Sequence, residues 1–179
     1  MTFHPATLDS QSPAVQFEEL LKALDNLELD LGIVFTRPNS DANGRKIFDL
    51  IATYVAGHSN ARVFSSLGQV IYLSLMAQVD AVVGNSSSGL YEMPSFKKAT
   101  VNIGDRQKGR HRAASVIDCA PKAADITCAM REAFTLDCSA TVNPYGDGDS
   151  AARIKNHLKA IAKPAALLQK HFFDRGGSE

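Results

Sequence analysis

The stretch "DAVVGNSSSGLYEMPSFKKATVNIGDRQKGR" (80–110) contains an apolar run, a serine turn and a second apolar run, and this order indicates the fold class. Its apolar run "AVVG" (81–84) includes two β-branched residues and predicts a short buried strand. Three serines follow, and a short helix is expected to begin at Ser88 and to be disturbed by Pro94. The run "ATVNI" (99–103) predicts the next strand. A strand, a helix and a second strand in this order indicate a βαβ unit and a parallel sheet.

The same alternation of strand and helix extends in both directions from this stretch. Further strands are predicted by the apolar runs "LGIVF" (31–35), "ARVF" (61–64) and "SVID" (115–118). Helical spacing links Phe17, Leu20, Leu21, Leu24 and Leu27; Ile47, Phe48, Ile51 and Val55; Ala123, Ile126, Met130, Ala133 and Phe134; and Ile154, Leu158 and Ile161. Ser12 and Pro13 provide an N-cap and a first-turn proline. The segment "LGQVIYLSLMAQ" (67–78) is apolar nearly all round, which predicts a helix packed on both sides.

These elements predict an α/β fold, a Rossmann-like three-layer parallel-sheet domain. No repeat or linker divides the chain, so residues 1–179 are expected to form a single domain. Hardly any strand precedes "FHP" (3–5), and we expect the chain to be cut or split within or just before its first strand. Ligands of such sheets bind beyond the carboxyl ends of the strands. The polar loops after "FHP", "IVFTRPN" (33–39) and "VVGNSSSG" (82–89) are therefore expected to line up along one edge.

Composition excludes several classes of protein. The 179 residues are 45% hydrophobic, and 19 basic side chains balance 19 acidic ones, so no overall field favours nucleic acid or an acidic membrane surface. No apolar run approaches the ~18 residues of a membrane span, and no secretory signal opens the sequence. Three cysteines fit no zinc spacing, and the acidic residues form no convincing ligand cluster. A cytoplasmic protein without metal or cofactor is the expectation.

The serine turn has a chemistry of its own. Amides at a helix start have no partner inside the helix, and that end of the helix dipole is positive, which suits a diphosphate. Glu92 lies about one turn after Ser88, and its two carboxylate oxygens suit the two hydroxyls of a ribose. This pattern predicts a cradle for a nucleotide diphosphate. In the alternative interpretation, Ser88 simply caps a helix and Glu92 is solvated.

Four motifs resemble one known family, in the order in which the family has them. The segment "GNSSSGLYEMPSFKKATVNIGDRQKGR" (84–110) resembles the signature of UDP-N-acetylglucosamine 2-epimerases, particularly the hydrolysing, sialic-acid-pathway type. "TFHPATL" (2–8), "FTRPNSDANGR" (35–45) and "NPYGDGDSAARI" (143–154) resemble its other motifs. The resemblance implies the C-terminal half of a glycosyltransferase-B-like enzyme, with the active site in a cleft between two Rossmann-like halves. The N-terminal half of the same enzyme is then an expected partner, and the complete enzyme is expected to be a homo-oligomer.

The resemblance also implies the residues of a site for a UDP-sugar substrate. By motif, Ser86 and Ser87 would hold the diphosphate, and Arg106 would belong to the same nucleotide site. Glu92 would bind the ribose hydroxyls, and the backbone of Leu67 would meet the uracil. Asn39 and the catalytic His4 would face the cleft near the phosphates and the sugar. Two of these residues have simpler interpretations. A lone histidine such as His4 is more often structural, and an asparagine after a proline, such as Asn39, is ordinary turn chemistry.

The implied reaction is hydrolysing 2-epimerisation. The family's hydrolysing members are thought to eliminate UDP from UDP-N-acetylglucosamine, after which water adds to the 2-acetamidoglucal to give N-acetylmannosamine. The loop "GDRQKGR" (104–110) favours this type, because non-hydrolysing relatives have a loop more like "RDTTERPE". The acids assigned to catalysis lie in the family's N-terminal half, so this chain alone is expected to be inactive. Three alternatives stay open: a 2-epimerase of UDP-N,N'-diacetylbacillosamine, a non-catalytic nucleotide-sugar-binding module, and the donor-binding half of a glycosyltransferase.

Overall fold

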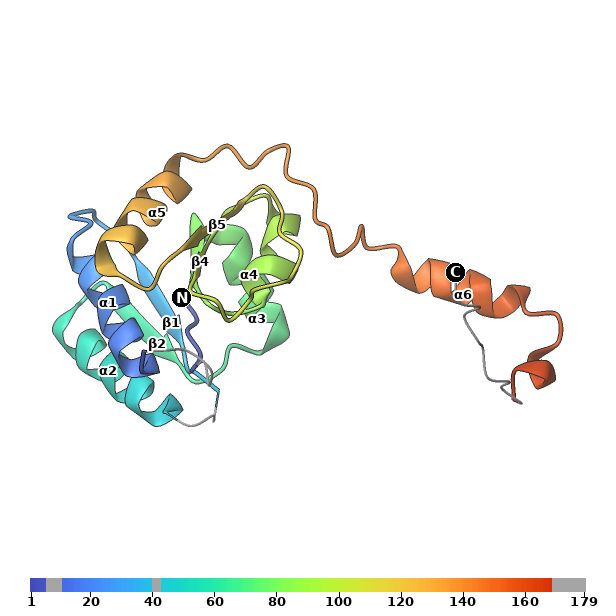
Figure 1. Ribbon diagram of the computed structural model, residues 1–179, viewed down its shortest axis with the longest axis horizontal. Coiled ribbons are helices and arrows are strands. Elements are labelled where there is room, and N and C mark those ends of the chain that lie inside the picture. Colours follow the sequence, from blue (N-terminus) through green and yellow to red (C-terminus); the bar gives the residue numbers. More distant parts are fainter. Residues whose placement is uncertain (6–10, 40–42, 169–179) are drawn as a thin grey trace, which may run out of the picture. The chain divides into compact units, whose positions relative to one another are not determined.

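A computed structural model of the chain describes residues 1–5, 11–39 and 43–168 (Figure 1). The chain divides into two units, Met1–Tyr145 and Gly146–Glu179, and the described residues of each are treated separately. Residues 6–8 and 40–42, which complete two of the four family-like motifs, lie outside the described residues. The assignment of residues 1–179 to a single domain stays a prediction.

The first unit is built on parallel strands. They are β1 (Ile33–Thr36), β2 (Ala61–Phe64), β3 (Ala81–Gly84), β4 (Ala99–Ile103) and β5 (Val116–Cys119). β1 pairs with β2, β3 with β4 and β4 with β5, in each case in parallel. All five strands lie where the sequence predicts them, to within two residues at either end.

Met1 and Thr2 connect the two groups of strands. The Thr36 amide donates to the Met1 carbonyl oxygen at 3.0 Å, and the Thr2 amide donates to the Val83 carbonyl oxygen at 3.2 Å. The spatial order is therefore β2, β1, residues 1–2, β3, β4, β5. This is the order of a doubly wound sheet, whose switch point lies between its first and fourth strands in chain order, here residues 1–2 and β3.

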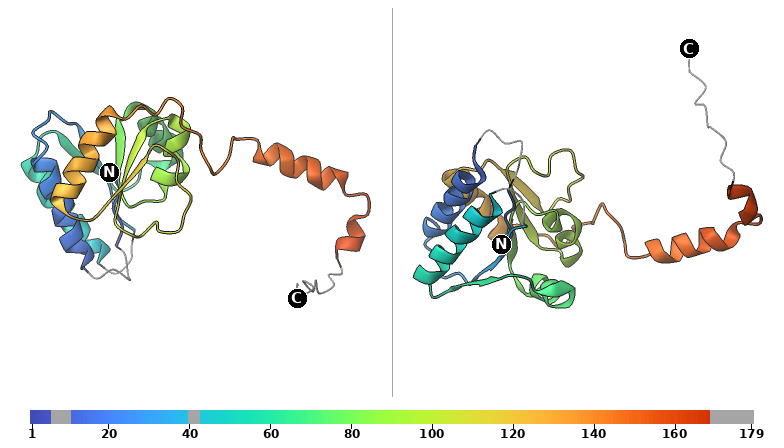
Figure 2. Two further views of the ribbon diagram at one scale, coloured as in Figure 1. Left: turned by 45° about the horizontal axis from the view of Figure 1, so that its top comes forward. Right: turned by 90° about the horizontal axis from the view of Figure 1, so that it is seen from below.

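Helices cover both faces of these strands, as predicted for a three-layer domain (Figure 2). One face carries α1 (Pro13–Asp25), α2 (Gly44–Gly57) and α5 (Ala123–Thr135), and the other carries α3 (Gly68–Gln78), α4 (Ser88–Tyr91) and the 3₁₀ turn η1 (Met93–Phe96). The core of the first face contains a chain of aromatic contacts from Phe3 through Phe17 and Phe35 to Tyr54, with ring centroids 5.6 to 6.2 Å apart. These rings tie the start of the chain to α1, β1 and α2.

The helix over 67–78 exists, as α3, but the prediction that it packs on both sides is wrong. Of its residues only Met76 is buried, whereas Val70 is 78% and Ile71 61% exposed. Tyr72 and Met76 face α4, where both reach Ser88. A helix that is apolar all round has no preferred face, so its sequence could not indicate that only one side meets a neighbour.

The second unit contains α6 (Ser150–Ala160) and the 3₁₀ turn η2 (Pro164–Leu167). α6 is the last helix that the spacing predicts, with Ile161 at its C-cap. Asp147 orders its beginning: its carboxylate accepts the Asp149 amide at 3.0 Å and two bonds from the Arg153 guanidinium at 2.8 and 2.9 Å. No residue of α6 is buried, and its apolar Ile154 and Leu158 are exposed.

Candidate functional site

Polar loops meet at the carboxyl edge of the sheet, around its switch point. A pocket of about 380 Å³ opens there, next to the ends of residues 1–2, β1 and β3. Three of the residues assigned from the motifs line this pocket, namely His4, Leu67 and Ser86, together with Arg37 and Tyr72. His4, Arg37 and Ser86 thus lie at one edge. The loops after "FHP" (3–5) and "IVFTRPN" (33–39) run through residues 6–10 and 40–42, which lie outside the described residues, so the alignment of all three loops stays a prediction.

Asn85, which directly follows β3, is the centre of the hydrogen-bond network at this edge. It is 1% exposed, and its side chain accepts the His4 amide at 2.7 Å and donates to the His4 carbonyl oxygen at 2.8 Å. Its own carbonyl oxygen accepts one bond from Arg106 Nη1 at 3.0 Å and one from Gln107 Nε2 at 2.7 Å. Asn85 therefore joins the loop of the first strand to the basic loop after β4.

Sequence reasoning did not single out Asn85 or Gln107. For Asn85 a signal was available, because it lies between the end of a buried strand and a serine run. A side-chain amide that is buried at such a place needs hydrogen-bond partners, and it therefore indicates a network. Gly84, one residue earlier, permits the close approach. Its φ is 142°, and a Cβ there would collide with the Thr2 carbonyl oxygen, so this position requires glycine.

His4 is held in one tautomer. Its Nδ1 accepts a hydrogen bond from the Asn39 backbone amide at 3.1 Å, which assigns the proton of the neutral ring to Nε2. Nδ1 is therefore not available to remove a proton. At this bond Asn39 acts through its backbone and not through its side chain.

The three serines of the turn have different surroundings. Ser87 is the N-cap residue of α4, and its side chain makes no capping bond. Ser86 Oγ instead accepts the Ser88 amide at 3.4 Å. Ser88 turns toward α3, with its Oγ 2.6 Å from the Tyr72 hydroxyl and 3.7 Å from Met76 Sδ. The interpretation of Ser88 as a simple helix cap is therefore wrong. Ser86 and Ser87 are half-buried, and Ser86 lines the pocket.

α4 is too short to provide the strong helix dipole that the sequence led us to expect at the serine turn. It has four residues, and a single turn sums few peptide dipoles. Any anion held at this edge would depend on the amides and hydroxyls of the turn and on the nearby guanidinium of Arg106.

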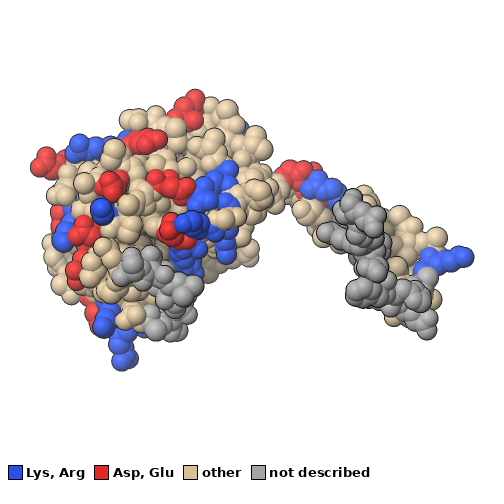
Figure 3. Space-filling view, viewed as in Figure 1, with Lys and Arg blue, Asp and Glu red and all other residues tan. Residues whose placement is uncertain are grey.

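Glu92 and Arg106 approach the turn from two further segments. Glu92 is exposed at the C-cap of α4. Arg106 is exposed in the loop of residues 104–112, which contains four basic residues; basic side chains gather on the first unit in Figure 3. The structure brings Arg106 to the serine turn through Asn85, and it places Glu92 one helical turn away from Ser88, as the spacing predicts.

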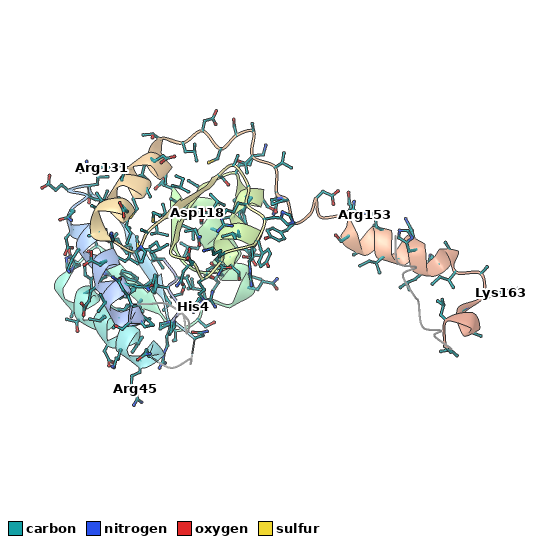
Figure 4. The ribbon with its side chains drawn as sticks, in the orientation of Figure 1. His4, Arg45, Asp118, Arg131, Arg153 and Lys163 are labelled. Carbon is teal, nitrogen blue, oxygen red and sulfur yellow. The ribbon has the colours of Figure 1, made fainter. Side chains whose placement is uncertain are left out.

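Arg112 and Asp118 tie the basic loop to the sheet. The Asp118 carboxylate, on β5, lies 2.6 Å from Arg112 Nε and accepts a bond of 2.6 Å from Asn102 Nδ2. Arg112 in turn donates to the carbonyl oxygens of Arg110 and Gln107, at 2.8 and 3.4 Å. Asp118 and His4 are both labelled on the first unit in Figure 4. The loop is thus anchored at two points, through Arg112 to β5 and through Gln107 to Asn85.

Cys119, a half-buried cysteine on β5, is not disposed to react as a thiolate. Burial, with smaller effects of Asp125 and Asp118, raises the pKa of Cys119 to about 12, so its thiol stays protonated at neutral pH. Over residues 1–5, 11–39 and 43–168, no group of three or more His, Cys, Asp or Glu side chains is placed to hold a metal ion. No helix within those residues is both long and apolar enough to cross a membrane.

Fold and site together define a Rossmann-like α/β domain with a pocket at its switch point. The sequence model of the family described as UDP-N-acetylglucosamine 2-epimerase matches residues 1–159. The chain therefore belongs to the UDP-N-acetylglucosamine 2-epimerase family, which confirms the resemblance seen in its motifs.

Curated relatives cover most of this chain. "UDP-N,N'-diacetylbacillosamine 2-epimerase (hydrolyzing)" of Legionella pneumophila is 33% identical over 170 residues, 95% of this chain and 44% of that protein. "GDP/UDP-N,N'-diacetylbacillosamine 2-epimerase (hydrolyzing)" of Campylobacter jejuni is 44% identical over 119 residues, 66% of this chain and 31% of that protein. "Polysialic acid biosynthesis protein P7" of Escherichia coli is 34% identical over 97% of this chain and 45% of its own length. The chain spans less than half the length of these relatives.

Solved structures show the same fold. S. aureus MnaA, solved with UDP, matches with a TM-score of 0.67 and 18% identity over 98% of this chain and 47% of its own. The UDP-GlcNAc 2-epimerase of Methanocaldococcus jannaschii, solved with UDP-GlcNAc and UDP, matches with a TM-score of 0.66 and 15% identity over 81% of this chain and 41% of its own. These likenesses confirm the predicted fold class, a Rossmann-like α/β domain of the glycosyltransferase-B-like type.

Proposed function

We propose that this chain is the UDP-binding half of a hydrolysing 2-epimerase, which converts UDP-N-acetylglucosamine into N-acetylmannosamine and UDP for the synthesis of sialic-acid-type sugars. The observation that carries the proposal is the network around Asn85. It joins the backbone of His4, the start of the serine turn and the guanidinium of Arg106, and two of these residues, His4 and Ser86, also line the pocket. Ring N–H, hydroxyl and guanidinium donors around a turn suit the several oxygens of a diphosphate.

Each residue of the site has a proposed role. Ser86, Ser87 and Arg106 hold the diphosphate, and Glu92 accepts bonds from the ribose hydroxyls. The uracil lies against the backbone of Leu67, which lines the pocket. Asn39 positions His4 through its amide, in addition to facing the sugar.

His4 acts on the leaving group in this proposal. Elimination moves negative charge onto the departing diphosphate, and a donor already aimed at that charge stabilises the transition state. Because Nδ1 accepts the Asn39 amide, the donor is Nε2–H. The groups that move protons on the sugar, which we expect to be carboxylates, belong to the N-terminal half. This chain alone therefore binds UDP without turnover, and the complete enzyme is a homo-oligomer.

A second substrate is favoured by the relatives. The Campylobacter and Legionella proteins are both named as hydrolysing 2-epimerases of diacetylbacillosamine nucleotides. UDP-N,N'-diacetylbacillosamine carries the same UDP group, so the site described above would serve it equally. The groups that distinguish the two sugars would contact the other half of the cleft.

A chimaera tests the reaction and the substrate together. The N-terminal half of the Legionella relative is joined to this chain, and release of UDP from each of the two UDP-sugars is measured, with the sugar product identified by NMR. We expect UDP and a free 2-epimerised sugar from the chimaera and neither from the chain alone. Robust turnover by the chain alone would contradict the half-enzyme proposal, and a UDP-linked product would contradict hydrolysis.

A further inference from the structure

The segment just before the second unit lies across two parts of the candidate site. Asn143 Nδ2 donates to the Tyr91 carbonyl oxygen at 2.8 Å and to Ser95 Oγ at 2.7 Å, so one side chain holds the end of α4 and the turn η1. Its Oδ1 accepts the Tyr145 amide at 2.9 Å, which fixes the local turn. All the polar atoms of the Asn143 side chain are thus engaged.

Tyr145 continues this contact to the basic loop. Its hydroxyl donates to the His111 carbonyl oxygen at 3.0 Å, and its ring meets the Tyr91 ring edge-on with centroids 4.2 Å apart. The guanidinium of Arg110 lies over the other ring of this pair, 5.2 Å from the Tyr91 centroid. Tyr145 therefore touches α4 and the loop of residues 104–112 at the same time.

The two segments that are joined in this way carry the two charged residues of the site. Glu92 directly follows Tyr91, and Arg106 and His111 both lie in the loop of residues 104–112. Both residues are exposed, and their supports are a single helical turn and a loop without regular structure. Arg106 is already held by its bond to the Asn85 carbonyl oxygen, and the contacts of Asn143 and Tyr145 add a direct connection between its loop and α4. Fixing the relative positions of two binding side chains before the ligand arrives lowers the entropic cost of binding.

We infer that Asn143 and Tyr145 are positioning residues that fix the distance between Glu92 and Arg106, and so fit the site to a ligand with a ribose and a diphosphate. The inference rests on the proposed function, because it takes Glu92 as the ribose contact and Arg106 as the diphosphate contact. Neither Asn143 nor Tyr145 touches the ligand. Asn143 acts on the ribose side through Tyr91, and the Tyr145 hydroxyl acts on the diphosphate side through His111.

The bond from Asn143 to Tyr91 and the bond from Tyr145 to His111 lead to different predictions for ligand preference. Asn143→Ala should weaken UDP binding about three- to tenfold and reduce the preference for UDP over 2'-deoxy-UDP. Tyr145→Phe, which removes only the hydroxyl, should leave that preference in place and reduce the preference for UDP over UMP by a similar factor. Asn143→Asp keeps the acceptor for the Tyr145 amide but cannot donate to Tyr91, so it should affect the ribose preference alone.

The experiment is calorimetric titration of UDP, 2'-deoxy-UDP and UMP into the chain and its variants, with the melting temperature of each variant recorded. Tyr54→Phe is the matched control, since it removes a tyrosine hydroxyl bonded to Asp25 at 3.0 Å on the side of α1 and α2. The control should lower the melting temperature and leave both preferences unchanged.

Two outcomes would contradict the inference at different levels. If the wild-type chain binds UDP and the variants at Asn143 and Tyr145 lose stability but keep both preferences, the segment supports the fold only and the positioning role is wrong. If the wild-type chain binds no UDP, the proposed function itself is wrong, and the positioning role is lost with it.

Discussion

At the scale of single residues, Glu92 differs in charge and in proposed role from the other residues of the site. It is the acidic residue assigned to the ribose, whereas the donors around Asn85 suit an anion. Its carboxylate can accept from both ribose hydroxyls, which a neutral amide does more weakly.

Replacing Glu92 with glutamine keeps the shape of the side chain and exchanges one charged acceptor for a donor. We expect UDP affinity to fall about tenfold and the preference for ribose over 2'-deoxyribose to fall with it. Titration of UDP and 2'-deoxy-UDP into Glu92→Gln measures both quantities. Unchanged binding of both ligands would remove the ribose role from Glu92.

The packing of residues 1–2 against β3 requires glycine at position 84. Its positive φ and its contact with Thr2 leave no room for a Cβ. Gly84→Ala should lower the free energy of unfolding by about 3 kcal/mol, because overpacking and backbone strain act at the same position. Urea-induced unfolding provides the measurement.

Gly57→Ala is the matched control for that measurement. Gly57 ends α2, and a Cβ there would meet nothing within 4 Å, so alanine should leave stability unchanged or raise it slightly. Equal stability of Gly84→Ala and the wild type would show that residues 1–2 do not lie against β3 in solution.

At the scale of elements, α5 depends on a carboxylate from another helix. Its N-cap residue, Lys122, supplies no side-chain cap, and the Ala123 amide instead donates to Glu19 Oε2 of α1 at 2.9 Å. The hydrogen bond from Lys22, followed by that of the Ala123 amide, lowers the pKa of the Glu19 carboxyl below its ordinary value of 4.5. The ionised form therefore favours the folded state.

This lowered pKa gives a pH-dependent test. A carboxyl with a lowered pKa stabilises the fold above its unfolded pKa, and the effect is lost as the pH falls through the folded value. Glu19→Gln should thus melt below the wild type at pH 7, and the difference should shrink as the pH falls below 4.5. Glu132→Gln, at an exposed position on α5, is the control. A difference that stays constant over this range would contradict the assignment.

The element scale also shows what the sequence could predict. Local signals sufficed for the strands and helices, because apolar runs, helical spacing and the Ser12 cap act within a few residues. They did not suffice for α3, whose exposed Val70 and Ile71 depend on which neighbours surround the helix. The surroundings of Ser88 were missed for the same reason, since its partners Tyr72 and Met76 come from that helix.

At the scale of the whole first unit, the site arises from strand order. Residues 1–2 lie between β1 and β3, which brings His4, the Asn39 amide and the serine turn to one edge. Alternation of strands and helices predicted that the loops would share an edge, but not the contacts between them. Asn85 and Gln107 remained unnoticed, because their role is to join loops that are distant in the sequence.

The central claim is that this edge binds the diphosphate of UDP, and amide NMR of the chain during a UDP titration tests it most directly. The account predicts that the amides of residues 85–89 shift and become protected, and that UMP has a weaker effect because it lacks the second phosphate. Amides of residues 85–89 that do not move at millimolar UDP would contradict the account.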